Sequence, residues 1–221
     1  MLSTLELETG DNPTFSVIWL HGLGADGNDF VPIVPEMGLP ADAAMRFVFP
    51  NAPMIPVTIN GGYVMPAWYD ILSLDGNRRD ADEVGIRATR DAIRELIERE
   101  NDRGIPCSRI VIAGFSQGGA MAYTIGLTHP EALAGIIALS AYLPAPELIQ
   151  DELSDANLRT PVFAGHGRHD DVVPLMLGEQ ACDIVRQLGG EPAWHTYAMP
   201  HTVCLDEITD IGAWLQQRLA D

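Results

Sequence analysis

The sequence contains no lysine, and all 13 of its basic residues are arginines. Its 31 acidic residues give a formal net charge of −18, so nucleic acids and anionic lipid surfaces would repel the chain. The longest mostly apolar stretch, LAGIIALSAYLPAP, is too short to span a bilayer. We therefore expect no nucleic-acid partner and no stable membrane insertion. Solubility explains the acidic composition most simply, and an acidic face that attracts a basic partner is the alternative.

Cysteine is also scarce. The three cysteines, Cys107, Cys182 and Cys204, are widely spaced and form no CxxC pair. This odd, scattered set argues against disulfides and is typical of a reducing compartment. The opening residues, MLSTLELETGDNP, are acidic and lack the apolar core of a secretory signal. We expect a cytoplasmic location.

Repeats and low-complexity segments are absent, and no change in composition marks a linker, so we expect one domain over residues 1–221. Short apolar runs alternate with amphipathic segments. The expected strands are LSTLELE, FSVIWL, RFVFP, RIVIAG, GIIALS, PVFAG and PAWHTYAM. The expected helices are 80–102, QGGAMAYTIGLTHP, LMLGEQACDIVRQLGG and LDEITDIGAWLQQRL. Such alternation predicts an α/β fold with a mostly parallel central sheet and helices on both faces. Prolines and glycines interrupt residues 51–76, which predicts an irregular excursion with short hairpins.

The stretch GFSQGG, residues 114–119, follows the expected strand RIVIAG and precedes an expected helix. It contains the pattern G-x-S-x-G centred on Ser116. In this context the sharp turn holds the serine in a strained backbone conformation and lifts its hydroxyl clear of the sheet. A turn that merely requires small residues is the alternative. The strand–turn–helix setting favours Ser116 as a nucleophile.

A serine nucleophile needs a base, and the base needs an orienting acid. The motif HGRHDDVVP follows one expected strand and offers both Asp170 and Asp171 as the acid. The motif MPHTVC follows the last strand and places His201 on a loop as the base. The order serine, acid, histidine is the order of α/β-hydrolases. Histidines 166 and 169 beside the aspartates suggest a metal site as an alternative, but the turn that presents Asp170 explains them better.

The loop LHGLGADG, residues 20–27, leaves an early strand and is rich in glycine. In a hydrolase of this fold, such a loop supplies one backbone N–H to the oxyanion hole, and the residue after the nucleophile supplies the other. Those donors would be Leu23 and Gln117. A phosphate-binding turn is the alternative, but the loop lacks the G-x-x-x-x-G-K-[ST] pattern. We expect His21 to hydrogen-bond this loop and to take no part in the chemistry.

An acyl chain needs an apolar wall, and residues 51–76 supply large apolar side chains. We expect Trp68 and Leu72 to contact substrate in a groove beside Ser116. Covering the edge of the sheet is the alternative role for this segment. The other apolar residues considered for the groove are Ile55, Val57, Ile59, Val64 and Met65.

Five blocks in order carry a resemblance to a known family: LHGLGADGNDF, FPNAPMIPVTINGGYVMPAWYDI, GFSQGGAM, GHGRHDDVVP and MPHTVCLDEI. Together they resemble the small carboxylesterase / acyl-protein thioesterase (phospholipase–carboxylesterase) family of α/β-hydrolases. The sequence of the second block, with PVTINGG and AWYDI, is most similar to that of bacterial carboxylesterases. The resemblance covers nearly the whole chain. It implies an α/β-hydrolase fold without a lid domain, no metal and no organic cofactor, and a homodimer as a common arrangement.

The same resemblance implies Ser116 as nucleophile, His201 as base and, through the pattern HGxxD, Asp170 as acid, with Leu23 and Gln117 as oxyanion donors. The leading hypothesis is a serine carboxylesterase that hydrolyses short- to medium-chain esters through an acyl-enzyme. An acyl-protein thioesterase or a lysophospholipase is the alternative within this class. A catalytically silent binding protein on a hydrolase scaffold and a serine peptidase are the more distant ones.

Overall fold

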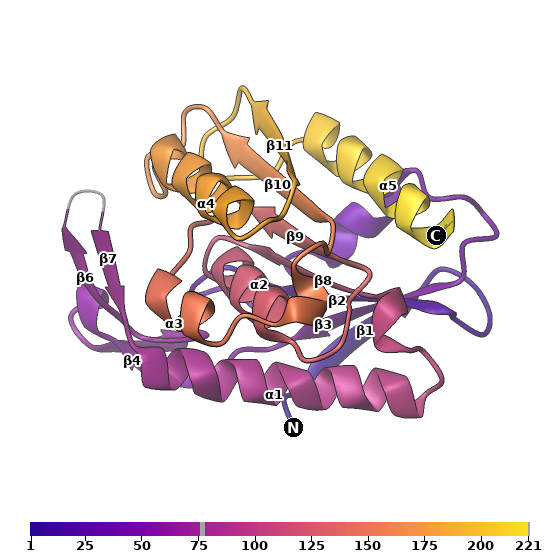
Figure 1. Ribbon diagram of the computed structural model, residues 1–221, viewed down its shortest axis with the longest axis horizontal. Coiled ribbons are helices and arrows are strands. Elements are labelled where there is room, and N and C mark those ends of the chain that lie inside the picture. The colour runs from indigo at the N-terminus through magenta and orange to yellow at the C-terminus, as the bar shows by residue number, and fades with distance from the viewer. Residues whose placement is uncertain (76–77, 221) are drawn as a thin grey trace.

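The computed structural model describes residues 1–75 and 78–220, and its centre is a seven-stranded sheet (Figure 1). The strand order is β1-β3-β2-β8-β9-β10-β11. Only β1 runs antiparallel to its neighbour, β3, and the remaining described pairs of this sheet are parallel. The expected mostly parallel α/β sheet is therefore confirmed. Its strands are β1 (Thr4–Glu8), β2 (Phe15–Leu20), β3 (Met45–Pro50), β8 (Ile110–Phe115), β9 (Gly135–Leu139), β10 (Val162–Gly167) and β11 (Pro192–Tyr197).

The central strands are buried on both faces, which explains why they appear in the sequence as continuous apolar runs. All six residues of β2 are buried. Because side chains alternate along a strand, Ile18 joins one hydrophobic cluster while Val17 and Trp19 join the cluster on the opposite face. The two clusters stabilise the sheet from both sides.

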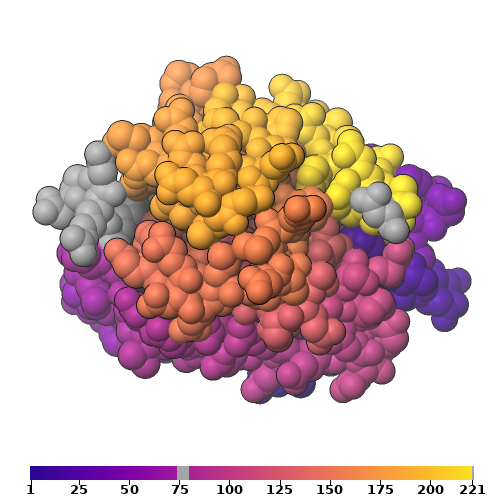
Figure 2. Space-filling model, viewed as in Figure 1, coloured from indigo at the N-terminus to yellow at the C-terminus, as the bar shows by residue number. Residues whose placement is uncertain are grey.

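Helices cover both faces of the sheet, as the sequence predicts. The cluster on one face includes residues of α1 (Glu83–Asp102), α2 (Gln117–Thr128), α3 (Pro146–Asp151) and α4 (Leu175–Gln187). Figure 2 shows that α1, α3 and α4 cover much of this side. The opposite cluster includes residues of α5 (Leu205–Ala220) and the 3₁₀ helix η1 (Val31–Met37). Among the described helices, none combines the length and apolar character needed to cross a membrane.

The excursion after β3 forms hairpins, as expected, although the last residue of the 51–76 stretch lies outside the described residues. The first hairpin pairs β4 with β5, and the second pairs β6 with β7. Their elements are β4 (Met54–Val57), η2 (Thr58–Asn60), β5 (Tyr63–Pro66), β6 (Ile71–Asp75) and β7 (Arg78–Ala81). The two further 3₁₀ turns are η3 (Cys107–Arg109) and η4 (Asp155–Asn157).

The helix expected over 80–102 begins later than the sequence pattern suggests. Residues 80 and 81 belong to β7, and the side chain of Asp82 caps the helix by accepting the N–H of Val84 at 3.0 Å. The helix ends before Gly104, which has a φ of 92°. An additional short helix, α3, begins at Pro146 in a segment for which no helix was expected.

Candidate active site

Ser116 occupies a strained turn between β8 and α2. Its φ of 55° and ψ of −118° lie outside the conformations that L-residues prefer, which costs about 1–3 kcal/mol. A Cβ on Gly114 would lie 2.3 Å from the backbone of Gly118, and a Cβ on Gly118 would lie 2.2 Å from the carbonyl oxygen of Leu20. Only glycines fit these two positions, so the sequence pattern follows from the close packing of the turn.

Three side chains that follow different strands meet at the carboxyl edge of the sheet. The Oγ of Ser116, after β8, lies 2.9 Å from Nε2 of His201, after β11. Nδ1 of the same imidazole lies 2.7 Å from Oδ2 of Asp170, after β10. This chain of hydrogen bonds has the geometry in which an imidazole takes a hydroxyl proton and a carboxylate stabilises the resulting cation.

Asp170 is held as a carboxylate. Its Oδ1 accepts the N–H groups of Val172 at 3.0 Å and Val173 at 2.7 Å. Burial opposes ionisation of this carboxyl, but the hydrogen bonds from His201 and from the Val173 N–H outweigh it and lower its pKa below the ordinary value. The group therefore carries a negative charge beside the imidazole of His201.

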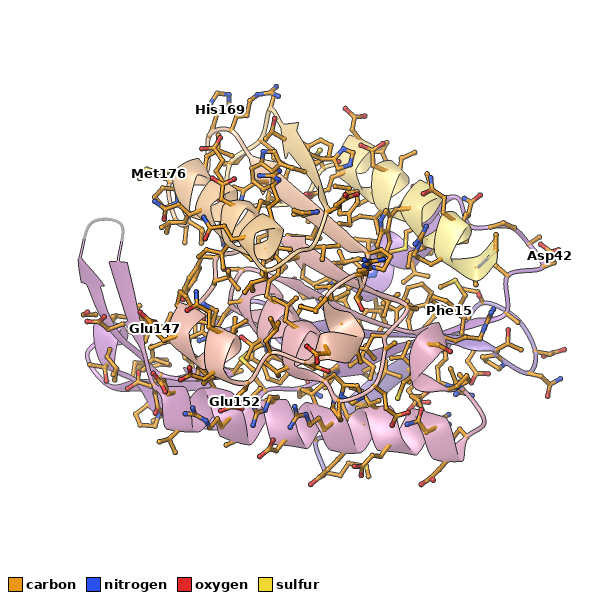
Figure 3. The ribbon with its side chains drawn as sticks, in the orientation of Figure 1. Phe15, Asp42, Glu147, Glu152, His169 and Met176 are labelled. Atoms are coloured by element: carbon orange, nitrogen blue, oxygen red, sulfur yellow. The ribbon has the colours of Figure 1, made fainter. Side chains whose placement is uncertain are left out.

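The structure distinguishes between the two adjacent aspartates. Asp170 is buried and contacts His201, whereas Asp171 is exposed. His169 is exposed too, at the outer end of the same loop (Figure 3). His166 is buried, its Nε2 lies 2.8 Å from the carbonyl oxygen of Val173, and burial lowers its pKa, so it remains neutral within the loop packing.

A cluster of potential metal ligands lies outside the site formed by Ser116, His201 and Asp170. Within residues 1–75 and 78–220, the one group of three whose donor atoms lie within 4.8 Å of each other is Cys107, His129 and Glu131. It lies at the amino end of β8, away from Ser116. Sγ of Cys107 is 3.6 Å from Nε2 of His129, and burial raises the pKa of this thiol, which disfavours the thiolate that a metal would require.

The glycine-rich loop after β2 is fixed by its histidine. Nδ1 of His21 lies 2.7 Å from the carbonyl oxygen of Gly22, and its Nε2 accepts the N–H of Ala52 at 3.1 Å. Burial lowers the pKa of this imidazole, so it stays neutral with the proton on Nδ1. The expected hydrogen-bonding role of His21 is confirmed. Leu23 and Gln117, the expected donor residues, both line the cavity that contains Ser116.

This cavity has a volume of about 400 Å³ and opens beside the serine and histidine. Phe115 lines it and packs against His201, with ring centroids 4.7 Å apart. Its walls are largely apolar, which suits an acyl chain. The lining residues are Gly22, Leu23, Ala25, Asp29, Ile59, Asn60, Ile71, Phe115, Ser116, Gln117, Tyr142, Val172 and His201.

The structure corrects the two expected substrate contacts. Trp68 is only 1% exposed and belongs to the core, where its indole Nε1 donates to the carbonyl oxygen of His21 at 2.8 Å. Leu72 is 47% exposed, and neither residue lines the cavity. The adjacent Ile71 does, because successive side chains of β6 point to opposite sides. Of the excursion's apolar residues, Ile59 was expected and is confirmed at the wall, whereas Ile71 was missed. Tyr142, which lies between β9 and α3, also lines the wall and was missed.

Comparisons with known proteins point to one family. A family model described as Phospholipase/Carboxylesterase matches residues 7–219. An acyl-protein thioesterase 1 from Neurospora crassa is 41% identical over 93% of this chain and 87% of its own. The protein of the same name from Mycosarcoma maydis is 39% identical over 98% of this chain and 97% of its own.

Solved structures of other proteins share this fold. The crystal structure of Arabidopsis thaliana SOBER1 superposes with a TM-score of 0.87 at 28% identity, covering 93% of this chain and 99% of that one. A Bacillus cereus carboxylesterase, at 17% identity and a TM-score of 0.80, covers 99% of this chain and 95% of its own, and shares the fold. Because the family model spans almost the whole sequence, the protein belongs to the phospholipase/carboxylesterase family of α/β-hydrolases and is a hydrolase with esterase or thioesterase activity.

Proposed function

We propose that the protein is a serine carboxylesterase that hydrolyses short- to medium-chain acyl esters through Ser116, His201 and Asp170. The observation that carries this proposal is the continuous hydrogen-bond chain of 2.9 Å and 2.7 Å from the serine hydroxyl to the buried carboxylate. The strained turn at the serine and the apolar cavity beside it support the same chemistry.

In the first half of the reaction, Nε2 of His201 removes the proton from Ser116 as Oγ attacks the carbonyl carbon of the ester. Asp170 keeps the imidazole in the required tautomer and stabilises the imidazolium. The negative charge that develops on the carbonyl oxygen is stabilised by the backbone N–H groups of Leu23 and Gln117. The second of these lies at the first residue of α2, where the helix dipole also favours negative charge.

The tetrahedral intermediate then collapses. The imidazolium of His201 gives its proton to the leaving oxygen or sulfur, and an acyl-enzyme remains on Ser116. In the second half, the same imidazole takes a proton from water, which attacks the acyl carbonyl and releases the carboxylic acid. Every proton moves through one side chain, so the neutral form of His201 is needed at the start of each half.

The cavity volume supports a preference for modest acyl chains. At about 400 Å³ it lies near the lower end of the range for small-molecule sites, about 300–1,000 Å³. A second candidate function, removal of acyl groups from protein thioesters, is favoured by relatives at 35–41% identity that carry the name acyl-protein thioesterase 1. Both reactions use the same nucleophile, and they differ in the leaving group and in the length of the acyl chain.

The test measures hydrolysis of p-nitrophenyl esters of increasing acyl length beside a palmitoyl-thioester peptide. Ser116→Ala should lose several powers of ten in kcat on every substrate. Cys204→Ala is the matched control, because this thiol is three residues from His201 and should not be needed. A fast rate on short and medium esters supports the carboxylesterase, and a preference for the thioester peptide supports the second candidate. Wild-type turnover by folded Ser116→Ala contradicts both.

A further inference from the structure

Four hydrogen bonds tie the loop that carries Leu23 to the excursion between β3 and α1; one, from the N–H of Gly27 to Oδ1 of Asn51 at 2.9 Å, lies farther along the loop, and three lie close to Leu23. The N–H of Ala52 donates to Nε2 of His21 at 3.1 Å, and the N–H of Gly24 donates to the carbonyl oxygen of Pro66 at 2.9 Å. The third bond comes from a side chain, as Nε1 of Trp68 donates to the carbonyl oxygen of His21 at 2.8 Å. Two of these bonds involve His21, two residues before Leu23.

The same excursion is tied to the serine turn through Gln117. The backbone N–H of Trp68 donates to Oε1 of Gln117 at 2.8 Å, and Nε2 of Gln117 donates to the carbonyl oxygen of Tyr69 at 2.8 Å. The hydroxyl of Thr89 in α1 donates to the carbonyl oxygen of Trp68. All the polar groups of Trp68 are therefore engaged, and they join the two segments that supply the candidate oxyanion donors.

Close packing also restricts the contact between Trp68 and His21. Trp68 is 1% exposed and His21 is equally buried, and their ring centroids lie 4.9 Å apart. A buried carbonyl that loses its donor is left unsatisfied, which is unfavourable, so removing the indole N–H would favour a rearranged loop. Oxyanion stabilisation depends on donors that are already in place when charge develops, which makes the spacing of the two N–H groups sensitive to such a rearrangement.

We propose that Trp68 is a positioning residue that fixes the spacing between the backbone donors of Leu23 and Gln117. This inference rests on the proposed function, because it assigns those donors to the oxyanion. Trp68 touches no reacting atom. It acts through the carbonyl of His21 on one side and the side chain of Gln117 on the other, and its indole N–H is the group that a conservative substitution removes.

The chain offers a matched control for this substitution. Trp19 is also 1% exposed, but its Nε1 is buried with no hydrogen-bond partner among the described residues. Trp68→Phe removes ring volume and a hydrogen bond, whereas Trp19→Phe removes ring volume alone. The two variants are compared by kcat and KM on a short p-nitrophenyl ester, by thermal unfolding, and by the affinity of phenylboronic acid, which forms a tetrahedral adduct with an active-site serine.

Trp68→Phe should lower kcat by about 10- to 100-fold, a fraction of the 10²–10³ lost with a whole oxyanion donor, and leave KM nearly unchanged. Its affinity for phenylboronic acid should fall in parallel. Trp19→Phe should keep kcat and the boronic acid affinity near wild type, even if both variants unfold at lower temperature. Equal kcat in the two variants, or an effect confined to KM, would overturn the inference.

Failure of the inference is distinguishable from failure of the proposed function, since Ser116→Ala reports on the latter alone. If Trp68→Phe does not fold, the inference is tested by the exchange of the indole N–H with solvent in the wild-type protein. Slower exchange at Trp68, with no change at Trp19, after a methylphosphonate is attached to Ser116 supports the coupling. Unchanged exchange at Trp68 in that adduct overturns it.

Discussion

Nδ1 of His201 lies 2.7 Å from Oδ2 of Asp170, and the other oxygen of that carboxylate accepts two backbone N–H groups. The carboxylate is thus held in one orientation by the loop on which it lies. In the proposed mechanism the imidazole presents Nε2 to Ser116, so we expect the orientation of Asp170 to determine which nitrogen of His201 carries the proton.

Asp170→Asn should therefore lower kcat by about 10⁴-fold, because an amide in this position favours the wrong imidazole tautomer. The control is Asp171→Asn, which removes the neighbouring exposed charge and should change kcat by no more than a few-fold. Steady-state kinetics on one ester, with circular dichroism to verify folding, compares the two. Similar losses in both variants would mean that the acid is not Asp170.

The serine turn predicts intolerance of even one added methyl group. A Cβ on Gly118 would lie 2.2 Å from the carbonyl oxygen of Leu20. We expect Gly118→Ala to yield little folded protein or to lower the unfolding temperature sharply. Gly38 provides the control, because its φ of 62° is accessible to asparagine and a Cβ there meets nothing within 4 Å. Gly38→Asn should express and unfold like wild type, and equal behaviour of the two variants would contradict the packing argument.

The sequence predicts the positions that depend on backbone geometry better than those that depend on side-chain direction. Local sequence patterns predict the glycines around Ser116 and the strand that precedes His201. The structure brings Ser116 and His201 together. From local chemistry alone, Asp170 and Asp171 are equivalent, and burial separates them. Trp68 was expected at the substrate wall because it is large and apolar, but its hydrogen bond to His21 places it in the core.

The error at Leu72 has a different cause. The sequence predicts short hairpins within residues 51–76, but it does not show which side of such a hairpin faces the cavity. The structure buries Ile71 at 4% exposure and leaves Leu72 at 47%. Packing against residues far away in the sequence sets the side of β6 that faces inward: Ile71 belongs to the hydrophobic cluster that includes residues of β8 and α2, and Leu72 does not.

The cavity wall provides a test of acyl-length preference. Ile59 lines the cavity from η2, so Ile59→Phe should reduce the space for an acyl chain and lower the rates on longer p-nitrophenyl esters more than on acetate. Leu72→Phe adds the same ring at an exposed position outside the cavity and should leave the ratio of long-chain to short-chain rates unchanged. A parallel shift of the ratio in both variants would show that the cavity does not hold the acyl chain.

Glu207 is a buried carboxyl in the first turn of α5 and is 0% exposed. Neither of its oxygens has a hydrogen-bond partner among the described residues, and Oε1 lies within 2.2 Å of where a Cβ on Gly165 would be. Burial, with a smaller contribution from the charge of Asp210, raises its pKa from 4.5 to about 8. The folded protein therefore holds this proton at pH values where the unfolded chain has lost it.

Because the folded form binds more protons than the unfolded form between pH 4.5 and about 8, this group makes stability fall as pH rises through that interval. Glu207→Gln replaces the acid by a neutral group of similar shape, so its unfolding temperature should decline less between pH 5 and pH 8 than that of wild type. The slope is the measured quantity, since the amide also changes stability at every pH. Asp206→Asn, at an exposed position in the same turn, should keep the wild-type slope. Identical slopes for Glu207→Gln and wild type would show that the buried carboxyl does not titrate in this interval.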